Sequence, residues 1–195
     1  MDSLLAEAKE LAGSGVRELI VIAQDITRYG SDWDGKRRLA ELLTELCKLD
    51  FHWIRLHYLY PDEIDEELIE VIARQPKILK YLDIPIQHVN DGILTAMNRR
   101  GTKAELEELF AALRERIPGL VLRTSLICGL PGEGEAEFEE LCRFLEEFHI
   151  ERAGVFPFSL QEGTVAAALP GQVDPEVTRR RVELLVDLQS RVMDA

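Results

Sequence analysis

Apolar residues change their spacing repeatedly along this chain. Short apolar runs, which are typical of strands buried on both faces, occur at residues 18–23, 53–57, 79–84, 120–127 and 153–158. Between these runs, apolar residues recur every three or four positions, which predicts amphipathic helices. The helices are expected at residues 3–12, 37–48, 62–74, 90–98, 102–116, 135–148 and 174–193.

Capping residues support several of these helix starts. N-caps are expected at Asp62, at Asn90 or Asp91, at Thr102 and at Asp174. Glu105 lies three residues after Thr102, which completes a capping-box pattern. The polar stretch 24–36 and the Gly- and Ala-rich stretch 163–172 are expected as loops.

Strands that alternate with helices predict an α/β fold with a parallel sheet and outer helices. Right-handed crossovers between parallel strands allow either an open doubly wound sheet or a curved barrel. Both arrangements bind ligands beyond the carboxyl ends of the strands. The segments that directly follow each strand are therefore the places to look for chemistry.

Composition narrows the class of protein. The chain has 195 residues, of which 46% are hydrophobic and 30% charged, as expected for one soluble domain. Its formal net charge of −13 disfavours general binding to a phosphate backbone, which depends on Lys and Arg. No apolar stretch is long enough to span a membrane, and the N-terminus lacks the features of a signal peptide. A cytoplasmic location is expected.

The cysteines and several histidines give no sign of a metal site. Cys47, Cys128 and Cys142 are too far apart for a close-spaced ligand motif, so small buried hydrophobic roles are favoured. His52, His57 and His149 also lack ligand-like spacing, and structural roles are favoured for them. No resident metal is predicted from these residues.

Amides, carboxylates, an imidazole and glycines follow the five expected strands. The five segments are 24–30, 58–61, 85–88, 128–133 and 159–164. Since the carboxyl ends of parallel strands meet at one edge of the sheet, these segments predict a polar small-molecule site.

Two segments allow both a binding and a structural interpretation. The turn Gly129–Glu133 has the composition to place backbone N–H groups around a ligand, or it is simply a tight turn between strand and helix. It is neither a Walker A loop nor a Gly-x-Gly-x-x-Gly motif. Gln87 and His88 have the polar groups to bind hydroxyls, but His88 alone is more typical of a structural histidine.

Polar and charged residues at two other strands also allow both a binding and a structural interpretation. Gln24 and Asp25 have the groups to hold an amino group, or Asp25 forms a local Asx-type turn. Arg123 lies within a strand, where an unpaired buried charge is costly. If it points inward, we expect a carboxylate partner from the ligand or from Asp25, Asp83 or Glu133; if outward, it is a surface residue.

Taken together, the motifs resemble those of the radical-SAM methylthiotransferases. The resemblance rests on Asp83-Ile-Pro-Ile-Gln-His88, on Met97 to Gly101, on Gly129 to Glu133, and on Gly154-Val-Phe onward. It runs from about residue 3 to residue 190. Gln87-His88, together with the segment 55–61, is similar to the branch of the family that methylthiolates an aspartate of ribosomal protein twelve of the small subunit.

The resemblance implies a fold and a chemistry. The family fold is a partial (β/α) barrel, in which a CxxxCxxC loop after the first strand holds a [4Fe–4S] cluster. The cluster binds S-adenosylmethionine (SAM) and cleaves it to a 5′-deoxyadenosyl radical, which removes a hydrogen atom from the substrate. Sulfur and methyl groups are then added to that carbon.

The chain departs from this pattern in one important respect. It has no CxxxCxxC motif, and its first expected strand corresponds to the second of the family. Residues 1–195 are therefore expected to be a single truncated barrel core. The first strand, the cluster loop, the N-terminal methylthiotransferase domain and the C-terminal β domain are expected to be absent. We expect that this core alone does not assemble the cluster and is inactive.

By resemblance, one group of residues is expected to bind SAM. It consists of Gln24, Asp25, Gln87, His88, Arg123, Gly129, Pro131, Gly132, Glu133 and Phe156. Residues after the first strand are expected near the methionyl amino group, and those after the third near the ribose or the substrate. The glycine-rich turn and the fifth strand are expected near the adenine, and Arg123 near a carboxylate.

The implied partner is a small-subunit ribosomal protein. Two alternatives stay open: a tRNA-modifying methylthiotransferase and a degenerate, non-catalytic interaction module. Direct binding of nucleic acid to this domain and association with membranes are not expected. Residues 18–23 are expected to form an edge strand, and such an edge is a candidate for pairing with a second copy.

Overall fold

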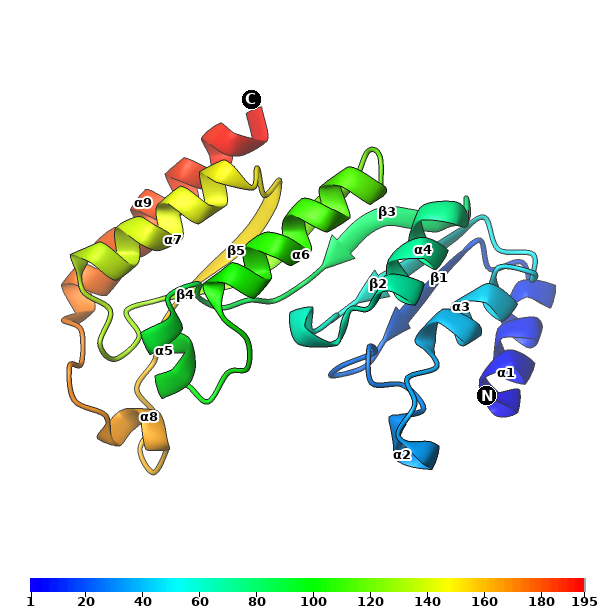
Figure 1. The fold of residues 1–195 in the computed structure, drawn as a ribbon, viewed down its shortest axis with the longest axis horizontal. Coiled ribbons are helices and arrows are strands. Elements are labelled where there is room, and N and C mark those ends of the chain that lie inside the picture. Colours follow the sequence, from blue (N-terminus) through cyan, green and yellow to red (C-terminus); the bar gives the residue numbers. More distant parts are fainter. Residues whose placement is uncertain (195) are drawn as a thin grey trace. The chain divides into compact units, whose positions relative to one another are not determined.

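The computed structural model describes residues 1–194 (Figure 1). These residues divide into two compact units, which are described separately. The first unit contains residues 1–84 and 112–121. The second unit contains residues 85–111 and the chain from residue 122 onward.

The first unit is a three-stranded parallel sheet with helices beside it. In chain order its elements are α1 (Asp2–Gly13), β1 (Glu18–Ile22), α2 (Ser31–Asp34), α3 (Leu39–Leu46), β2 (Trp53–His57), the 3-10 turn η1 (Pro61–Glu63), α4 (Glu66–Arg74) and β3 (Ile78–Asp83). β2 pairs in parallel with both β1 and β3. Within this unit β1 is an edge strand, as the sequence predicts.

Two side chains define the ends of α4. The prediction that Asp62 caps this helix is wrong, because residues 61–63 form the 3-10 turn η1. The cap is Asp65, whose Oδ1 accepts a hydrogen bond from Leu68 N at 2.9 Å. At the other end, Lys80 of β3 donates to the carbonyl oxygens of Ile72, Ala73 and Gln75. The ammonium group thereby satisfies carbonyls that a helix end leaves unpaired.

The second unit combines two parallel strands with helices beside them. Its elements are α5 (Asp91–Ala96), β4 (Val121–Cys128), α7 (Glu135–Glu147), β5 (Arg152–Pro157), α8 (Val165–Ala168) and α9 (Pro175–Asp194). The residues of α6 (Lys103–Arg116) are shared between the two units. β4 and β5 pair in parallel from Arg123↔Arg152 to Cys128↔Pro157. Burial alternates along β4, so one face packs into the core and the other is partly open.

The capping predictions in the second unit are confirmed. Asn90 Oδ1 accepts from Ile93 N at 3.1 Å, and Asp174 Oδ1 accepts from Glu176 N at 2.8 Å. Thr102 N donates to Glu105 Oε2 at 2.7 Å, which completes the expected capping box. The two expected loops are less irregular than the sequence indicates, because each contains one short helix, α2 or α8.

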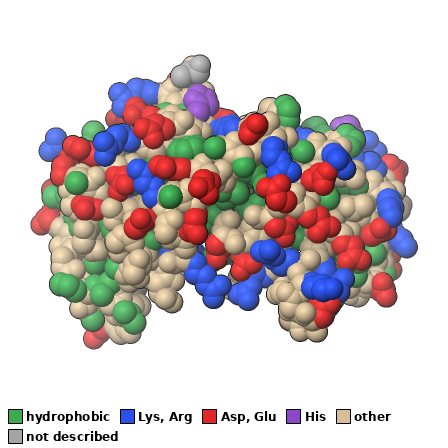
Figure 2. All heavy atoms as spheres, viewed as in Figure 1, with side chains coloured by type: hydrophobic (Ala, Val, Ile, Leu, Met, Phe, Trp, Pro, Cys, Tyr) green, Lys and Arg blue, Asp and Glu red, His purple; other side chains and the backbone are tan. Residues whose placement is uncertain are grey.

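Surface charge follows the composition. Figure 2 shows acidic and basic side chains intermingled over the face in view.

No helix among residues 1–194 is long and apolar enough to cross a membrane.

Candidate functional site

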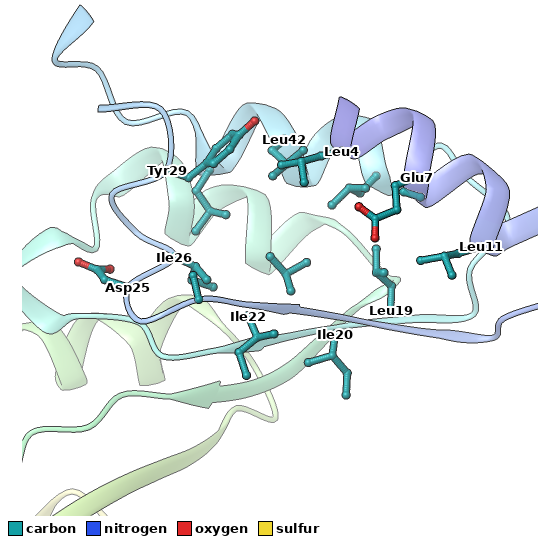
Figure 3. Close-up of a pocket in the computed structure, with 15 residues that line it drawn as sticks. Leu4, Glu7, Leu11, Leu19, Ile20, Ile22, Asp25, Ile26, Tyr29 and Leu42 are labelled. Atoms are coloured by element: carbon teal, nitrogen blue, oxygen red, sulfur yellow. The ribbon is translucent and has the colours of Figure 1, made fainter. Parts of the chain in front are cut away.

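In the first unit, Asp25 lies just beyond β1 at the end of a pocket (Figure 3). Its Oδ1 accepts from Thr27 N at 2.9 Å and from the Thr27 hydroxyl, so an Asx-type turn forms. The pocket measures about 480 Å³, and its lining is mostly apolar side chains of α1, β1 and α3. Gln24, the other predicted ligand of this segment, is exposed.

In the second unit, Gln87 is inserted into the hydrogen-bond pattern of β4. Its N–H donates to Ser125 O at 2.9 Å, and its carbonyl accepts from Ile127 N at 2.8 Å. A φ of 62° at Gln87 bends the chain at this point, and such a conformation is strained for a residue with a side chain. Its side-chain Oε1 is buried and has no hydrogen-bond partner in the described chain. A buried acceptor without a donor is the kind of group that a ligand satisfies.

His88 follows directly and is completely buried. Its Nδ1 accepts from Asn90 N at 3.0 Å, so the neutral ring carries its proton on Nε2. That Nε2 has no hydrogen-bond partner among the described residues and lies 3.7 Å from Glu133 Oε2. Burial lowers the pKa of His88 to about 4, although nearby carboxylates including Glu140 oppose the shift. The ring is therefore a neutral donor at physiological pH.

Gln87 and His88 both line a small pocket of about 90 Å³. The other residues in its lining are Ile93, Leu94, Met97, Arg99, Ile127 and Leu130. The pocket therefore combines a mostly apolar wall with one acceptor and one donor that have no hydrogen-bond partner in the described part of the chain.

Glu133 lies inside the turn that follows β4 and is 3% exposed. Its Oε2 accepts from Gly129 N at 2.8 Å and from Leu130 N at 3.4 Å, while its Oε1 accepts from Arg181 Nη1 at 3.0 Å. Burial raises the pKa of Glu133, against the opposing effects of these hydrogen bonds and of the Arg181 charge. Its carboxylate therefore fixes the turn from within, and both oxygens are already engaged.

The same turn depends on two glycines. Gly129 has a φ of +81°, and a Cβ there would lie 2.2 Å from Thr178 Oγ1. Gly132 has a φ of +88°, and its N–H donates to Gly171 O at 2.8 Å. Pro131 between them is buried. The turn is thus packed against the segment that leads into α9 and against α9 itself.

A partly open face of β4 and β5 carries the remaining predicted residues. The strand register places Ser125 opposite Gly154 and Ile127 opposite Phe156. Phe156 is 51% exposed, and a Cβ on Gly154 would lie 3.1 Å from its ring atom Cε2 and 3.9 Å from Arg123 Nη2. The absence of a side chain at Gly154 therefore leaves room for the aromatic ring and the guanidinium group.

The described residues do not suit an iron–sulfur cluster. No group of three or more His, Cys, Asp or Glu residues among positions 1–194 is arranged to hold a metal ion. The thiols also resist ionisation, because burial raises the pKa of Cys128 to about 12 and that of Cys142 to about 11.

Two residues of this site escaped the sequence reasoning. Thr178 and Arg181 of α9 are 5% and 6% exposed and contact the glycine-rich turn. In the sequence, Arg181 ends a run of three arginines that is typical of a solvated helix face. The only sequence signal for a partner of Arg181 is the acidic residues of the turn after β4. Because they are distant along the chain, the sequence does not reveal the pairing.

Comparison with known proteins points to one family. Residues 1–145 match the family model of the Radical SAM superfamily. The chain is 52% identical over 193 residues to the ribosomal protein uS12 methylthiotransferase RimO of Anaeromyxobacter sp., an alignment that covers 98% of this chain and 41% of that protein. It is 51% identical to RimO of Geobacter sulfurreducens, with coverage of 98% and 43%. The chain therefore spans about two fifths of the length of these curated relatives.

Solved structures give the same fold. Coproporphyrinogen III oxidase HemN from Escherichia coli, described as a radical SAM enzyme, superposes with a TM-score of 0.74 at 16% identity over 98% of this chain and 45% of that one. Streptococcus suis SuiB bound to S-adenosylmethionine superposes with a TM-score of 0.62 at 17% identity, covering 97% of this chain and 40% of that one. These similarities confirm the expected radical-SAM type of α/β fold.

Proposed function

We propose, since this chain belongs to the radical SAM superfamily, that it forms the SAM-binding core of a methylthiotransferase that modifies ribosomal protein uS12. The observation that carries the proposal is the 52% identity to a uS12 methylthiotransferase over 98% of the chain. By the resemblance of the motifs, the modified group is an aspartate side chain. The partner is then a small-subunit ribosomal protein, and the expected location is the cytoplasm.

The second unit offers groups that match the parts of SAM. Phe156 presents an exposed ring beside Gly154, which suits stacking against a purine. Arg123 extends along the same face of β4 and supplies a positive charge for a carboxylate. SAM bound here would supply, after one-electron reduction by an external donor, the 5′-deoxyadenosyl radical that abstracts hydrogen. A separate SAM molecule would supply the methyl group, because reductive cleavage leaves the methyl of the first on methionine.

Gln87 and His88 suit the polar groups of the ribose. The Gln87 Oε1 accepts, and the His88 Nε2–H donates, so one hydroxyl has the chemistry to satisfy both. The conformation of the loop is fixed before any ligand binds, because Gln87 is paired to β4 through its backbone. Such preorganisation lowers the entropic cost of binding.

The turn after β4 contributes to the proposed site through its shape, which depends on Gly129, Pro131, Gly132 and Glu133. Because both Glu133 oxygens are engaged within the protein, we assign this residue the role of holding the turn in position. In the first unit, Asp25 uses its Oδ1 for the Asx turn, and for this unit by itself the binding of an amino group by Gln24 and Asp25 stays a prediction. No step of the reaction is assigned to an iron–sulfur cluster held by residues 1–194, because their side chains do not fit one.

Mass spectrometry on the protein encoded by the complete reading frame tests the function. After reconstitution with iron and sulfide, it should add one methylthio group to purified uS12 in the presence of SAM and a reductant. Unmodified uS12 together with modified tRNA would instead identify a tRNA-modifying enzyme. The absence of any product from either substrate would support a non-catalytic interaction module.

A SAM-binding measurement tests the assignment of the ligand groups. Phe156→Ala should weaken SAM binding by about tenfold, because one aromatic face is lost. Leu184→Ala is the matched control, since Leu184 is similarly exposed at 48% but lies on α9. Equal affinities of the two variants would contradict the assignment of Phe156.

A further inference from the structure

The sheet of the first unit has one face that its helices do not cover. Leu19 of β1 points toward α1, whereas Ile20 and Ile22 project from the opposite side of the strand (Figure 3). Ile20 and Ile22 are 50% and 60% exposed. The strand register places Arg55 opposite Ile20 and His57 opposite Ile22. A guanidinium and an imidazole therefore lie next to exposed apolar side chains.

Arg55 is held firmly on this face. Its Nε donates to Glu18 Oε1 at 2.6 Å, and its Cζ lies 5.2 Å from the centre of the Tyr81 ring. These contacts fix the plane of the guanidinium through one nitrogen and one aromatic face. The Nη1 and Nη2 atoms have no hydrogen-bond partner among residues 1–194. They form the fork with which arginine binds a carboxylate in a bidentate manner.

His57 is oriented by a buried acid. Its Nδ1 lies 3.2 Å from Asp83 Oδ2, and Asp83 is 1% exposed. The His57 side chain itself is 25% exposed, so the ring can reach a ligand from Nε2. Its ring also lies 6.4 Å from that of Tyr81, which thus contacts both residues of the pair. The sequence pattern favours a structural role for His57, but this geometry resembles an imidazole positioned for use.

The chain turns sharply directly after the pair. Tyr58 has a φ of 61° and is 41% exposed. Its carbonyl accepts from Ile26 N at 3.2 Å, and the next residue, Leu59, donates to Asp83 O at 2.9 Å. The backbone directly after His57 is therefore tied to the loop after β1 and to the last residue of β3. A strained residue held by its neighbours is characteristic of functional sites.

We propose that Arg55 and His57 form a carboxylate-binding pair that recognises the acidic side chain of the protein substrate. Glu18, Tyr81 and Asp83 are positioning residues that hold the pair in place. The apolar side chains of Ile20 and Ile22 exclude water beside the guanidinium, which strengthens an ion pair with a ligand. The inference rests on the proposed function for its choice of substrate, an aspartyl residue in a protein segment.

Two sources of a carboxylate must be separated, namely the substrate aspartate and the methionine portion of SAM. The test uses the reconstituted enzyme from the complete reading frame with a synthetic uS12 peptide that carries the target aspartate. Arg55→Gln should raise the KM for this peptide by about 10- to 100-fold, because a charge-assisted bidentate contact is lost. SAM affinity should stay within about twofold of wild type, since that binding needs neither residue of the pair.

A second peptide with asparagine at the target position sharpens the test. By fluorescence anisotropy, wild-type enzyme should bind the aspartate peptide at least tenfold more tightly than the asparagine peptide. Arg55→Gln should abolish this preference, and Arg55→Lys should restore only part of it, because lysine lacks the fork. Arg74→Gln is the matched control, since Arg74 is exposed on α4 and pairs with Glu70.

The outcomes separate this inference from the proposed function. A peptide KM and a peptide preference that Arg55→Gln leaves unchanged in a folded enzyme would overturn the inference. A loss of SAM affinity instead would assign Arg55 to the methionyl carboxylate, and that result also overturns it. If wild-type enzyme modifies no uS12 peptide, the proposed function fails. The anisotropy preference then still decides whether the pair recognises a carboxylate.

Discussion

The guanidinium of Arg181 donates through Nη1 to two oxygens of Glu133, the side-chain Oε1 at 3.0 Å and the backbone carbonyl at 2.8 Å. The two residues are 6% and 3% exposed. They lie 48 positions apart along the chain, and the contact joins α9 to the turn after β4. Removing one member of such a pair leaves the other charge buried without compensation.

Arg181→Met should therefore destabilise the folded chain by roughly 3–5 kcal/mol in urea denaturation. The control is Arg179→Met, because Arg179 is 61% exposed and forms a surface ion pair with Glu176 on the same helix. A change of about 0.5 kcal/mol or less is expected for that variant. Equal losses for the two variants would show that the buried pair is not important for stability.

Gly129→Ala should destabilise the turn for two separable reasons. The φ of +81° disfavours any side chain, and a Cβ would meet the side chain of Thr178. Gly15→Ala isolates the first effect, since Gly15 has a φ of +88° with nothing within 4 Å of a Cβ. We expect a cost of roughly 1–2 kcal/mol at Gly15 and a clearly larger one at Gly129. Similar thermal midpoints for the two variants would contradict the steric argument.

His88 should make the chain less stable in acid. Its pKa falls from 6.5 in the unfolded chain to about 4 in the folded one, so between these values the unfolded state binds more protons. Its stabilising contribution is fully present above pH 6.5 and is lost as the pH falls toward 4. The loss reaches roughly 3 kcal/mol.

The contribution of His88 must be separated from that of Glu133, which titrates in an overlapping range. The raised pKa of Glu133 acts with the opposite sign, because its stabilising effect is lost as the pH rises from 4.5 through the folded-state pKa. Urea denaturation of wild type and His88→Asn across pH 4–7 isolates the histidine. The free-energy difference between them should shrink as the pH falls. Parallel curves for His88→Asn would contradict the assignment.

Cys128 should be inert to thiol reagents in the folded chain. It is fully buried, and its pKa of about 12 leaves almost no thiolate at neutral pH. With Ellman's reagent, Cys128 should react only at the rate of unfolding, while half-buried Cys47 reacts earlier. The Cys128→Ser variant identifies which phase belongs to this thiol. Fast labelling of Cys128 in the absence of denaturant would show that the strand end opens readily.

Sequence reasoning captured the features that depend on local patterns. The periods of apolar residues placed the strands to within about one or two residues, and the Asn90, Thr102 and Asp174 caps followed from their immediate neighbours. The error at Asp62 arose because Asp62 and Asp65 are both suitable N-caps for α4. Asp62 follows Pro61 in a 3-10 turn, so the cap is Asp65.

Features that depend on distant contacts were not accessible from the pattern. The sequence does not distinguish Arg181 from the two exposed arginines that precede it. Its burial is seen only in its packing against the turn after β4. Likewise, the strained φ of Gln87 and its unpaired Oε1 accompany its pairing with Ser125 and Ile127 of β4, which are distant along the chain. Alternation of strands and helices predicts where a loop ends, but not which side-chain atoms it leaves unsatisfied.

The insertion of Gln87 into the ladder of β4 also determines how this part of the protein can move. The loop that carries Gln87 and His88 shares its backbone hydrogen bonds with the strand that carries Arg123. That strand is in turn in register with Phe156 of β5. Any displacement of β4 therefore carries all four groups along together and preserves their mutual spacing. If the proposed SAM site lies in this unit, we expect ligand exchange to involve a shift of this wall as one body rather than independent swinging of its loops.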